Sequence, residues 1–240
     1  MLEGIITKGY SGFYYVFTDG QVKECSLRGR FRHKDVDFLP GDKVLISLLK
    51  NGKGVVEEVL PRRNSLLRPT IANVDQVIIV LAIDNPAPDL NLLDRLLIQV
   101  EAAGVSPLIC FNKIDLLSSK TENLAVIYRK VGYYTLEVSA HTNKGILDLR
   151  KALKDKVSVF AGPSGVGKSS LLNTVQPGVS LKTGDVSQKL RRGRHTTRHV
   201  ELLHLDGGGL VADTPGFSAL SLPVMKRNEL AGFFPEMDEL

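Results

Sequence analysis

A glycine-rich stretch that follows a short apolar run constrains this 240-residue chain more than any other feature of its sequence. Residues 157–161 are mostly apolar and predict a buried strand, and a helix is predicted to begin at Ser170. The stretch between them has the pattern Gly-x4-Gly-Lys-Ser and is composed of Gly162, Pro163, Ser164, Gly165, Val166, Gly167, Lys168, Ser169 and Ser170. A strand, a glycine turn and a helix in this order predict an α/β domain with a P-loop.

The P-loop pattern predicts phosphate binding by this whole stretch. Successive backbone N–H groups can curl around a phosphate, and the helix N-terminus adds partial positive charge. Lys168 is expected to reach the β- and γ-phosphates of a nucleotide, and Ser169 to bind Mg²⁺. The alternative is a glycine turn that joins a strand to a helix and binds nothing. The complete pattern in its strand–loop–helix context favours phosphate binding.

Residues 1–65 predict a separate all-β domain. Short β-rich runs separated by turn residues lie at 4–7, 12–17, 21–27, 43–47 and 54–59. Five short strands in this length predict a small OB-like barrel. A basic segment at 28–34 and the aromatics Tyr10, Tyr14 and Tyr15 favour RNA binding by this barrel. In the alternative, the aromatics belong to the core and the arginines only aid solubility.

Residues 66–222 predict a mostly parallel sheet with helices on both faces, after a linker around 62–69. Strands are expected at 76–82, 107–111 and 135–138, and helices at 91–103, 124–131 and 146–153. Residues 223–240 are expected to begin a C-terminal segment.

Two loops at predicted strand ends suit a guanine base. In the first, Asn112-Lys113-Ile114-Asp115, the Asp115 carboxylate can accept from both N1–H and N2–H2 of guanine. Lys113 can lie along the base, and Asn112 can tie this loop to the P-loop. In the second loop, small residues at Ser139 and Ala140 would let a backbone N–H approach the guanine O6. On its own, the four-residue pattern at 112–115 would indicate only a strand-to-helix turn. The guanine interpretation therefore depends on the presence of the P-loop.

Two further loops suit a γ-phosphate. Arg194-His195-Thr196-Thr197-Arg198 contains a threonine able to bind Mg²⁺ when a triphosphate is present, and the Thr-Arg pattern of other GTPases favours Thr197 over Thr196. In Asp213-Thr214-Pro215-Gly216, Asp213 is expected to hold Mg²⁺ through water, and the Gly216 N–H to contact the γ-phosphate. Without the flanking motifs, the two threonines would indicate only a polar loop.

The order of these motifs is rotated relative to a linear GTPase, because the base-binding loops precede the P-loop. Such a rotation is tolerated because every motif follows a strand at its carboxyl end, so the site does not depend on where the chain begins. Residues 182–199 carry six Lys or Arg against Asp185 alone. This basic excess favours an anionic partner such as RNA, with a solvated loop as the alternative.

The motifs Gly-Pro-Ser-Gly-Val-Gly-Lys-Ser-Ser, Arg-His-Thr-Thr-Arg-His and Asp-Thr-Pro-Gly-Phe, in this order after a small barrel, resemble the circularly permuted ribosome small-subunit-dependent GTPase A (RsgA) family. The resemblance covers nearly all of the chain. It implies a cytoplasmic enzyme that binds GTP or GDP with Mg²⁺, binds the small ribosomal subunit and its rRNA late in maturation, and hydrolyses GTP there. We expect a monomer, and no apolar run approaches a membrane span.

The resemblance also implies features of catalysis and of the C-terminus. Phe217 stands where many GTPases carry a water-orienting glutamine, so the family resemblance favours His195 for that role, with His199 as the weaker choice. Family members continue with a zinc-binding Cys/His segment after the Phe-Pro stretch, here Phe234-Pro235. Leu240 ends this sequence without such ligands, so we expect a truncated chain in which the family's zinc ligands are absent and ribosome docking is incomplete.

Two other functions remain open from the sequence. The first is an RNA-binding assembly factor for which the nucleotide is only a structural ligand. The second is a P-loop ATPase or kinase, which the pattern at residues 112–115 disfavours.

Overall fold

The computed structural model describes residues 1–31, 37–67, 69–117, 123–177, 200–212 and 229–237. These residues divide into two compact units. The first comprises described residues up to Val74 together with 200–203, and the second begins at Asp75 and resumes at His204.

The first unit is built on a closed five-stranded barrel, as the sequence predicts. Its strands are β1 (Leu2–Tyr10), β2 (Phe13–Thr18), β3 (Gln21–Leu27), β4 (Lys43–Leu48) and β5 (Gly54–Val59), in the order β1-β2-β3-β5-β4. Strands β3 and β5 are parallel, whereas β1 pairs antiparallel with β2 and with β4, β2 with β3, and β4 with β5. Alternate residues point inward and form a core of Ile6, Val16, Cys25, Val44, Ile46 and Val56. A short 3-10 helix, η1 (Gly29–Phe31), follows β3.

The segment predicted as a linker contains a hairpin. Strands β6 (Ser65–Leu67) and β7 (Thr70–Ala72) pair antiparallel. Leu66 and Ile71 lie opposite each other and are buried, so this short ribbon has an apolar face of its own. The turn residues around Pro69 indicated a linker, but they connect two strands that are each too short to show a clear period.

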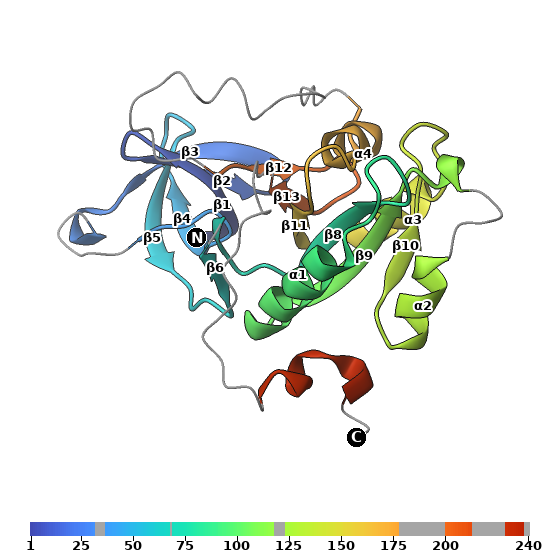
Figure 1. Ribbon diagram of the computed structural model, residues 1–240. Helices are drawn as coiled ribbons and strands as arrows, with labels where there is room; N and C mark the ends of the chain where they lie inside the picture. The colour runs from blue at the N-terminus through green and yellow to red at the C-terminus, as the bar shows by residue number, and fades with distance from the viewer. Residues whose placement is uncertain (32–36, 68, 118–122, 178–199, 213–228, 238–240) are drawn as a thin grey trace, which may run out of the picture. The chain divides into compact units, whose positions relative to one another are not determined.

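The second unit is an α/β domain with the strand order β10-β9-β8-β11-β13-β12 (Figure 1). The strands are β8 (Gln76–Ala82), β9 (Ser106–Asn112), β10 (Thr135–Glu137), β11 (Val157–Ala161), β12 (Leu202–His204) and β13 (Leu210–Ala212). All pairings from β10 through to β13 are parallel. The carboxyl ends of these strands therefore share one edge, where the loops of a nucleotide site can meet.

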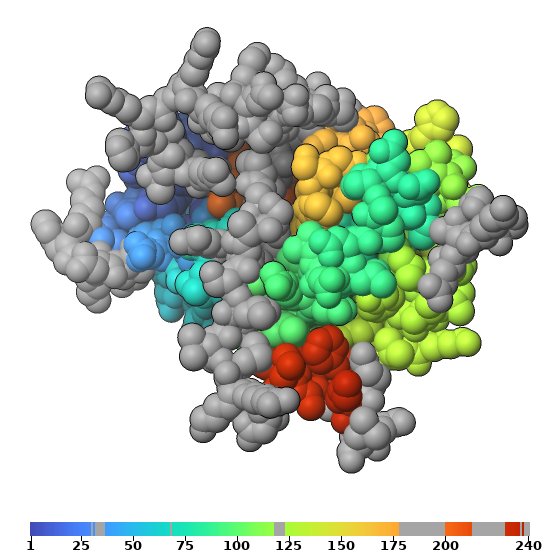
Figure 2. All heavy atoms as spheres, in the orientation of Figure 1, coloured from blue at the N-terminus to red at the C-terminus, as the bar shows by residue number. Residues whose placement is uncertain are grey.

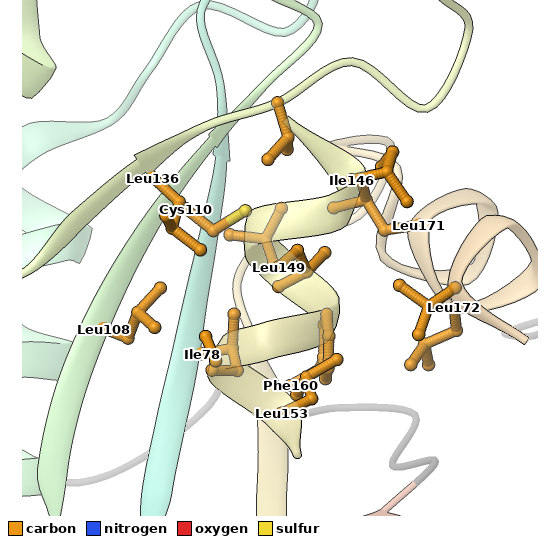
Figure 3. Close-up of a cluster of buried hydrophobic side chains, with 14 of the residues drawn as sticks. Ile78, Leu108, Cys110, Leu136, Ile146, Leu149, Leu153, Phe160, Leu171 and Leu172 are labelled. Atoms are coloured by element: carbon orange, nitrogen blue, oxygen red, sulfur yellow. The ribbon is translucent and has the colours of Figure 1, made fainter. Parts of the chain in front are cut away.

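Helices α1 (Leu90–Ala102), α2 (Leu124–Lys130), α3 (Ile146–Leu153) and α4 (Lys168–Val175) pack on this sheet. Side chains of α3 and α4 meet Ile78, Val80 and Phe160 in the main core, part of which Figure 3 shows. Every residue of β8 is buried, so both faces of the central sheet are covered. Helix α1 contacts β8 and β9, and the short helix η4 (Ala231–Phe233) contacts α1, as the red and green spheres of Figure 2 show. A second short helix, η5 (Pro235–Met237), follows η4.

The elements differ from the sequence predictions mainly at their ends. Helix α4 begins at Lys168, two residues before the predicted start, because Gly167 caps it with a left-handed φ of 95°. Another short 3-10 helix, η2 (Ile114–Leu116), follows β9 where the sequence indicated only a loop. Strand β12 was not predicted, since three residues are too few to show a period.

Candidate nucleotide-binding site

The loop between β11 and α4 takes its shape from glycines that no other residue could replace. Gly162 has a φ of 128°, and a Cβ atom there would lie 2.2 Å from the Val80 carbonyl oxygen. Gly167 has a φ of 95°, and a Cβ atom there would lie 2.4 Å from the Asn112 Nδ2 atom. The chain is thus curled tightly at both ends of the loop, the form that aims backbone N–H groups at a phosphate.

Lys168 spans the loop that it follows. Its Nζ donates hydrogen bonds to the carbonyl oxygens of Gly162 at 2.8 Å and Pro163 at 2.7 Å. Burial lowers the pKa of this ammonium group below its ordinary value. The amine therefore lies over the concave side of the loop, where phosphate oxygens can replace the two carbonyls as acceptors. Ser169 and Ser170 follow in the first turn of α4, where the helix N-terminus adds its partial charge.

Asn112 joins three loops. Its side chain is almost fully buried, its Nδ2 donates to the Val166 carbonyl at 2.8 Å, and its Oδ1 accepts from the Ala140 N–H at 3.3 Å. These two bonds tie the loop of residues 112–115 to the P-loop and to the loop of Ser139 and Ala140, the second loop predicted to contact the base. The tie between Asn112 and the P-loop is the contact that the sequence suggested.

The Asp115 carboxylate is oriented by a hydrogen bond from a neighbouring loop. The Ser139 hydroxyl donates to Asp115 Oδ1, and the Thr142 N–H donates to Ser139 Oγ at 3.0 Å. The Ser139 hydrogen bond is the largest cause that lowers the pKa of Asp115, and the nearby charges of His141 and Lys113 act in the same direction. The Asp115 side chain is 22% exposed, so its carboxylate is accessible from solvent.

Two residues near this site were not singled out from the sequence. The His141 Nδ1 lies 3.7 Å from Asp115 Oδ2, and the Lys113 Nζ donates to the Asn85 carbonyl. Lys113 itself has a left-handed φ of 63°, and Ile114 donates its N–H to the Val138 carbonyl at 3.3 Å. The position of His141 directly after Ser139-Ala140 was the available signal, whereas nothing in the sequence marked Asn85.

Four predicted site residues lie outside the described residues: His195, Thr197, Asp213 and Gly216. Of the predicted magnesium ligands, Ser169 alone falls within the described part, where its hydroxyl is the kind of oxygen donor that Mg²⁺ accepts. The described ranges contain no group of three or more His, Cys, Asp or Glu side chains placed to hold a metal ion.

No helix in the described part of the chain is long and apolar enough to cross a membrane.

Comparison with known proteins shows which family this chain belongs to. The RsgA GTPase family model matches residues 59–223, and the RsgA N-terminal domain model matches residues 3–56. The chain belongs to the RsgA GTPase family. Its β-barrel and its α/β domain, with the predicted base-binding loops ahead of the P-loop, are therefore those of a circularly permuted GTPase.

Several relatives are similar over nearly the whole chain. The small ribosomal subunit biogenesis GTPase RsgA of Moorella thermoacetica is 53% identical over 239 residues, which are 100% of this chain and 82% of that protein. The protein of the same name from Geobacillus kaustophilus is 50% identical over 98% of this chain and 82% of its own length.

Two solved structures show the same fold. The crystal structure of YjeQ from Thermotoga maritima has a TM-score of 0.83 at 34% identity and covers 97% of this chain and 81% of its own. The structure of YloQ, described as a circularly permuted GTPase, has a TM-score of 0.81 at 37% identity and covers 100% of this chain and 80% of its own.

Proposed function

We propose that this chain is a GTPase that binds the small ribosomal subunit and hydrolyses GTP during late maturation of that subunit, with turnover stimulated by rRNA. The observation that carries the proposal is the hydrogen bond from Asn112 Nδ2 to the Val166 carbonyl, which connects the loop of Asp115 with the loop of Lys168. A carboxylate suited to guanine and an ammonium suited to phosphates are thereby fixed on one domain. The names of the relatives supply the ribosomal partner.

In the proposed complex, Asp115 accepts from the guanine N1–H and N2–H2, and the Ala140 N–H lies near O6. Lys113 and Ile114 complete the first base-binding loop, and Ser139 orients the carboxylate. The backbone from Gly162 to Ser170 surrounds the phosphates, and Lys168 exchanges its carbonyl acceptors for β- and γ-phosphate oxygens. The Gly216 N–H is proposed to contact the γ-phosphate.

Ser169, Thr197 and Asp213 are the residues proposed to hold magnesium. Bound Mg²⁺ would neutralise charge that develops on the phosphate oxygens. His195 is proposed to orient the attacking water. Substitution of His195 by Ala should therefore lower stimulated hydrolysis and leave GDP affinity intact, whereas an equal loss of both would indicate a structural role.

The barrel domain, proposed as residues 1–65, presents a surface suited to unpaired RNA. Tyr10 is 61% exposed and Phe13 is 44% exposed, and the two face each other across β1 and β2. The Lys53 Nζ lies 6.0 Å from the centre of the Phe13 ring. Exposed aromatic rings beside a lysine can stack on bases and pair with phosphates. Tyr14, in contrast, packs against the barrel core and against the Phe38 ring at 5.0 Å.

The proposal also covers the location of the protein, its oligomeric state and the bounds of its domains. We propose that the protein acts in the cytoplasm, where it would meet the small ribosomal subunit, and that it acts there as a monomer. The permuted GTPase domain is proposed to span residues 66–222, and residues 223–240 to begin the C-terminal segment.

The decisive experiment is GTP turnover titrated with purified small ribosomal subunits. The expected result is slow turnover by the free protein and a rise of several powers of ten with subunits, on the scale seen for other partner-stimulated GTPases. Tight GTP binding without phosphate release at any subunit concentration would support an RNA-binding assembly factor with a structural nucleotide. Fast turnover that subunits do not change would contradict the proposed stimulation.

A second experiment tests the RNA surface with two tyrosines of similar exposure. Tyr10→Ala should weaken small-subunit binding about tenfold, as loss of one base-stacking contact does. Tyr134, 59% exposed on the GTPase domain, provides the matched control, and Tyr134→Ala should leave binding unchanged. Equal effects of the two substitutions would exclude a specific role for the barrel surface.

A further inference from the structure

Residues 83–89 form a loop beside both halves of the candidate nucleotide site. They follow β8, which lies between β9 and β11 in the sheet. Strand β9 leads into the loop of Lys113 and Asp115, and β11 leads into the P-loop. Because the three strands are parallel, their carboxyl ends share one edge of the sheet. The loop after β8 therefore has the loop predicted to bind the base on one side and the P-loop on the other.

This loop is anchored at both of its ends. The Ile83 N–H donates to the Asn112 carbonyl at 2.9 Å, next to the last paired residues of β8 and β9. At the other end, the Asp89 carboxylate accepts from the Leu92 N–H at 3.0 Å and caps α1. The chain between these two points is short, so its backbone has little freedom to move.

The middle of the loop contacts both neighbouring loops. The Asn85 carbonyl accepts a hydrogen bond from the Lys113 Nζ. The adjacent Pro86 has its Cδ 3.7 Å from the position that a Cβ atom on Gly165 would occupy. Asn85 has a positive φ of 49°, a conformation that asparagine tolerates and β-branched residues avoid. Its carbonyl is therefore a defined acceptor for Lys113, beside the P-loop.

We propose that Asn85 is a positioning residue for guanine binding, because its carbonyl holds the Lys113 side chain across the face of the base. The inference rests on the proposed function, in which Lys113 belongs to the loop that binds the base. A lysine side chain in solution samples many rotamers. An acceptor that holds it in one of them before the base arrives lowers the entropic cost of binding. Asn85 needs no contact with the nucleotide and acts through Lys113.

Two other roles of this loop make different predictions. If the loop only supports the P-loop through Pro86, a change at Asn85 should weaken the binding of phosphates with or without a base. If the contact between Asn85 and Lys113 has no role, its loss should leave nucleotide affinity unchanged. Positioning of Lys113 predicts a loss that requires the base and that disappears once the Lys113 ammonium group is removed.

The experiment is a double-variant cycle on GDP affinity. Lys113→Met keeps an apolar stem and removes the ammonium group, and Asn85→Val disfavours the positive φ that aims the carbonyl. Each should lower GDP affinity about fivefold, because the stem of residue 113 then has to be ordered by the base itself. The variant with both substitutions should lose no more than the weaker-binding single variant, whereas independent roles would multiply to about 25-fold. Asn85→Gly tolerates the positive φ and should bind GDP more tightly than Asn85→Val.

Two controls separate positioning from general damage. Calorimetric titration with inorganic pyrophosphate reports on the P-loop without a base, and its affinity should stay unchanged in both single variants. The matched control for backbone strain is Asp155→Val. Asp155 is exposed like Asn85 and has a φ of 57°, but it lies just before β11, at the opposite edge of the sheet. Asp155→Val should bind GDP like the wild type.

Several outcomes would overturn the inference alone: a 25-fold loss in the double variant, equal weakening of pyrophosphate and GDP by Asn85→Val, or the same loss of GDP affinity in Asp155→Val. Wild-type GDP affinity in Lys113→Met would also overturn it, and this test holds even if Asn85→Val does not fold. A wild-type protein that does not prefer GDP to ADP would overturn the proposed guanine site and the inference with it.

Discussion

The loops around Asp115 are held by side chains, whereas the loop from Gly162 to Gly167 is shaped by its backbone. At the base end, Ser139 bonds to Asp115 and Asn112 bonds to the neighbouring loops. At the phosphate end, the curvature comes from glycines with positive φ, and the first of these leaves no room for a Cβ atom. A base is recognised by a few directed acceptors and donors, while a phosphate is surrounded by many backbone N–H groups.

This difference predicts different kinds of damage at the two ends. A substitution in the phosphate loop should weaken the binding of every nucleotide whatever its base, because the phosphate chain does not depend on the base. A substitution at the base end should change which base is preferred and leave a folded, phosphate-binding domain. Gly167 lies where the two ends meet, since the atom nearest to its missing Cβ belongs to Asn112.

The largest effect is expected for Gly167→Ala. The new Cβ atom would lie 2.4 Å from Asn112 Nδ2 in a backbone conformation that alanine rarely adopts. GDP and GTP affinity should both fall about 100-fold, which corresponds to roughly 3 kcal/mol of strain. Titration with a fluorescent nucleotide measures the loss. Gly165→Ala is the control, because Gly165 has a φ of 81° but only Pro86 Cδ at 3.7 Å from its Cβ position. A loss as large for Gly165→Ala would show that the contact with Asn112 is unimportant.

The sequence predicted the central elements of both ends but not the contacts that hold them. Long apolar or periodic runs, such as β8 and α1, were located to within a residue or so, because burial on one or both faces leaves a period. Strand β12 and the β6–β7 hairpin were missed, since three-residue strands leave none. The tie from Asn112 to the P-loop was predicted from its motif, whereas the bond from Ala140 to Asn112 and the approach of His141 to Asp115 depend on how two distant loops fold together.

A smaller effect, confined to the base, is expected for Asp115→Asn. The amide offers one acceptor and one donor in place of two acceptors, so guanine loses one hydrogen bond to an ionised group. GDP affinity should fall roughly 10- to 100-fold, and affinity for xanthosine diphosphate should rise. Competition of each diphosphate against a fluorescent nucleotide measures the preference. Unchanged selectivity for guanine would exclude Asp115 as the base-recognising group.

The smallest effect is expected for Ser139→Ala, which removes the hydrogen bond that orients Asp115. Near neutral pH, GDP affinity should fall about fivefold, because Asp115 keeps its charge and its contact with the base but loses the hydroxyl that orients it. Thr142→Ala is the control, because Thr142 donates to Ser139 through its backbone N–H, which alanine retains.

The pH dependence separates this role from simple packing. Guanine binding needs Asp115 ionised, so affinity is present above the pKa of Asp115 and is lost as pH falls through it. Ser139 lowers that pKa below its ordinary value of 3.8, and its removal should raise the pKa again. The acid loss of GDP affinity should therefore begin at a higher pH in Ser139→Ala than in the wild type or in Thr142→Ala. If Ser139→Ala loses fivefold in GDP affinity but the pH at which acid abolishes binding does not change, Ser139 supports the loop and leaves the Asp115 carboxylate unaffected. The base end would then depend on its backbone, as the phosphate end does.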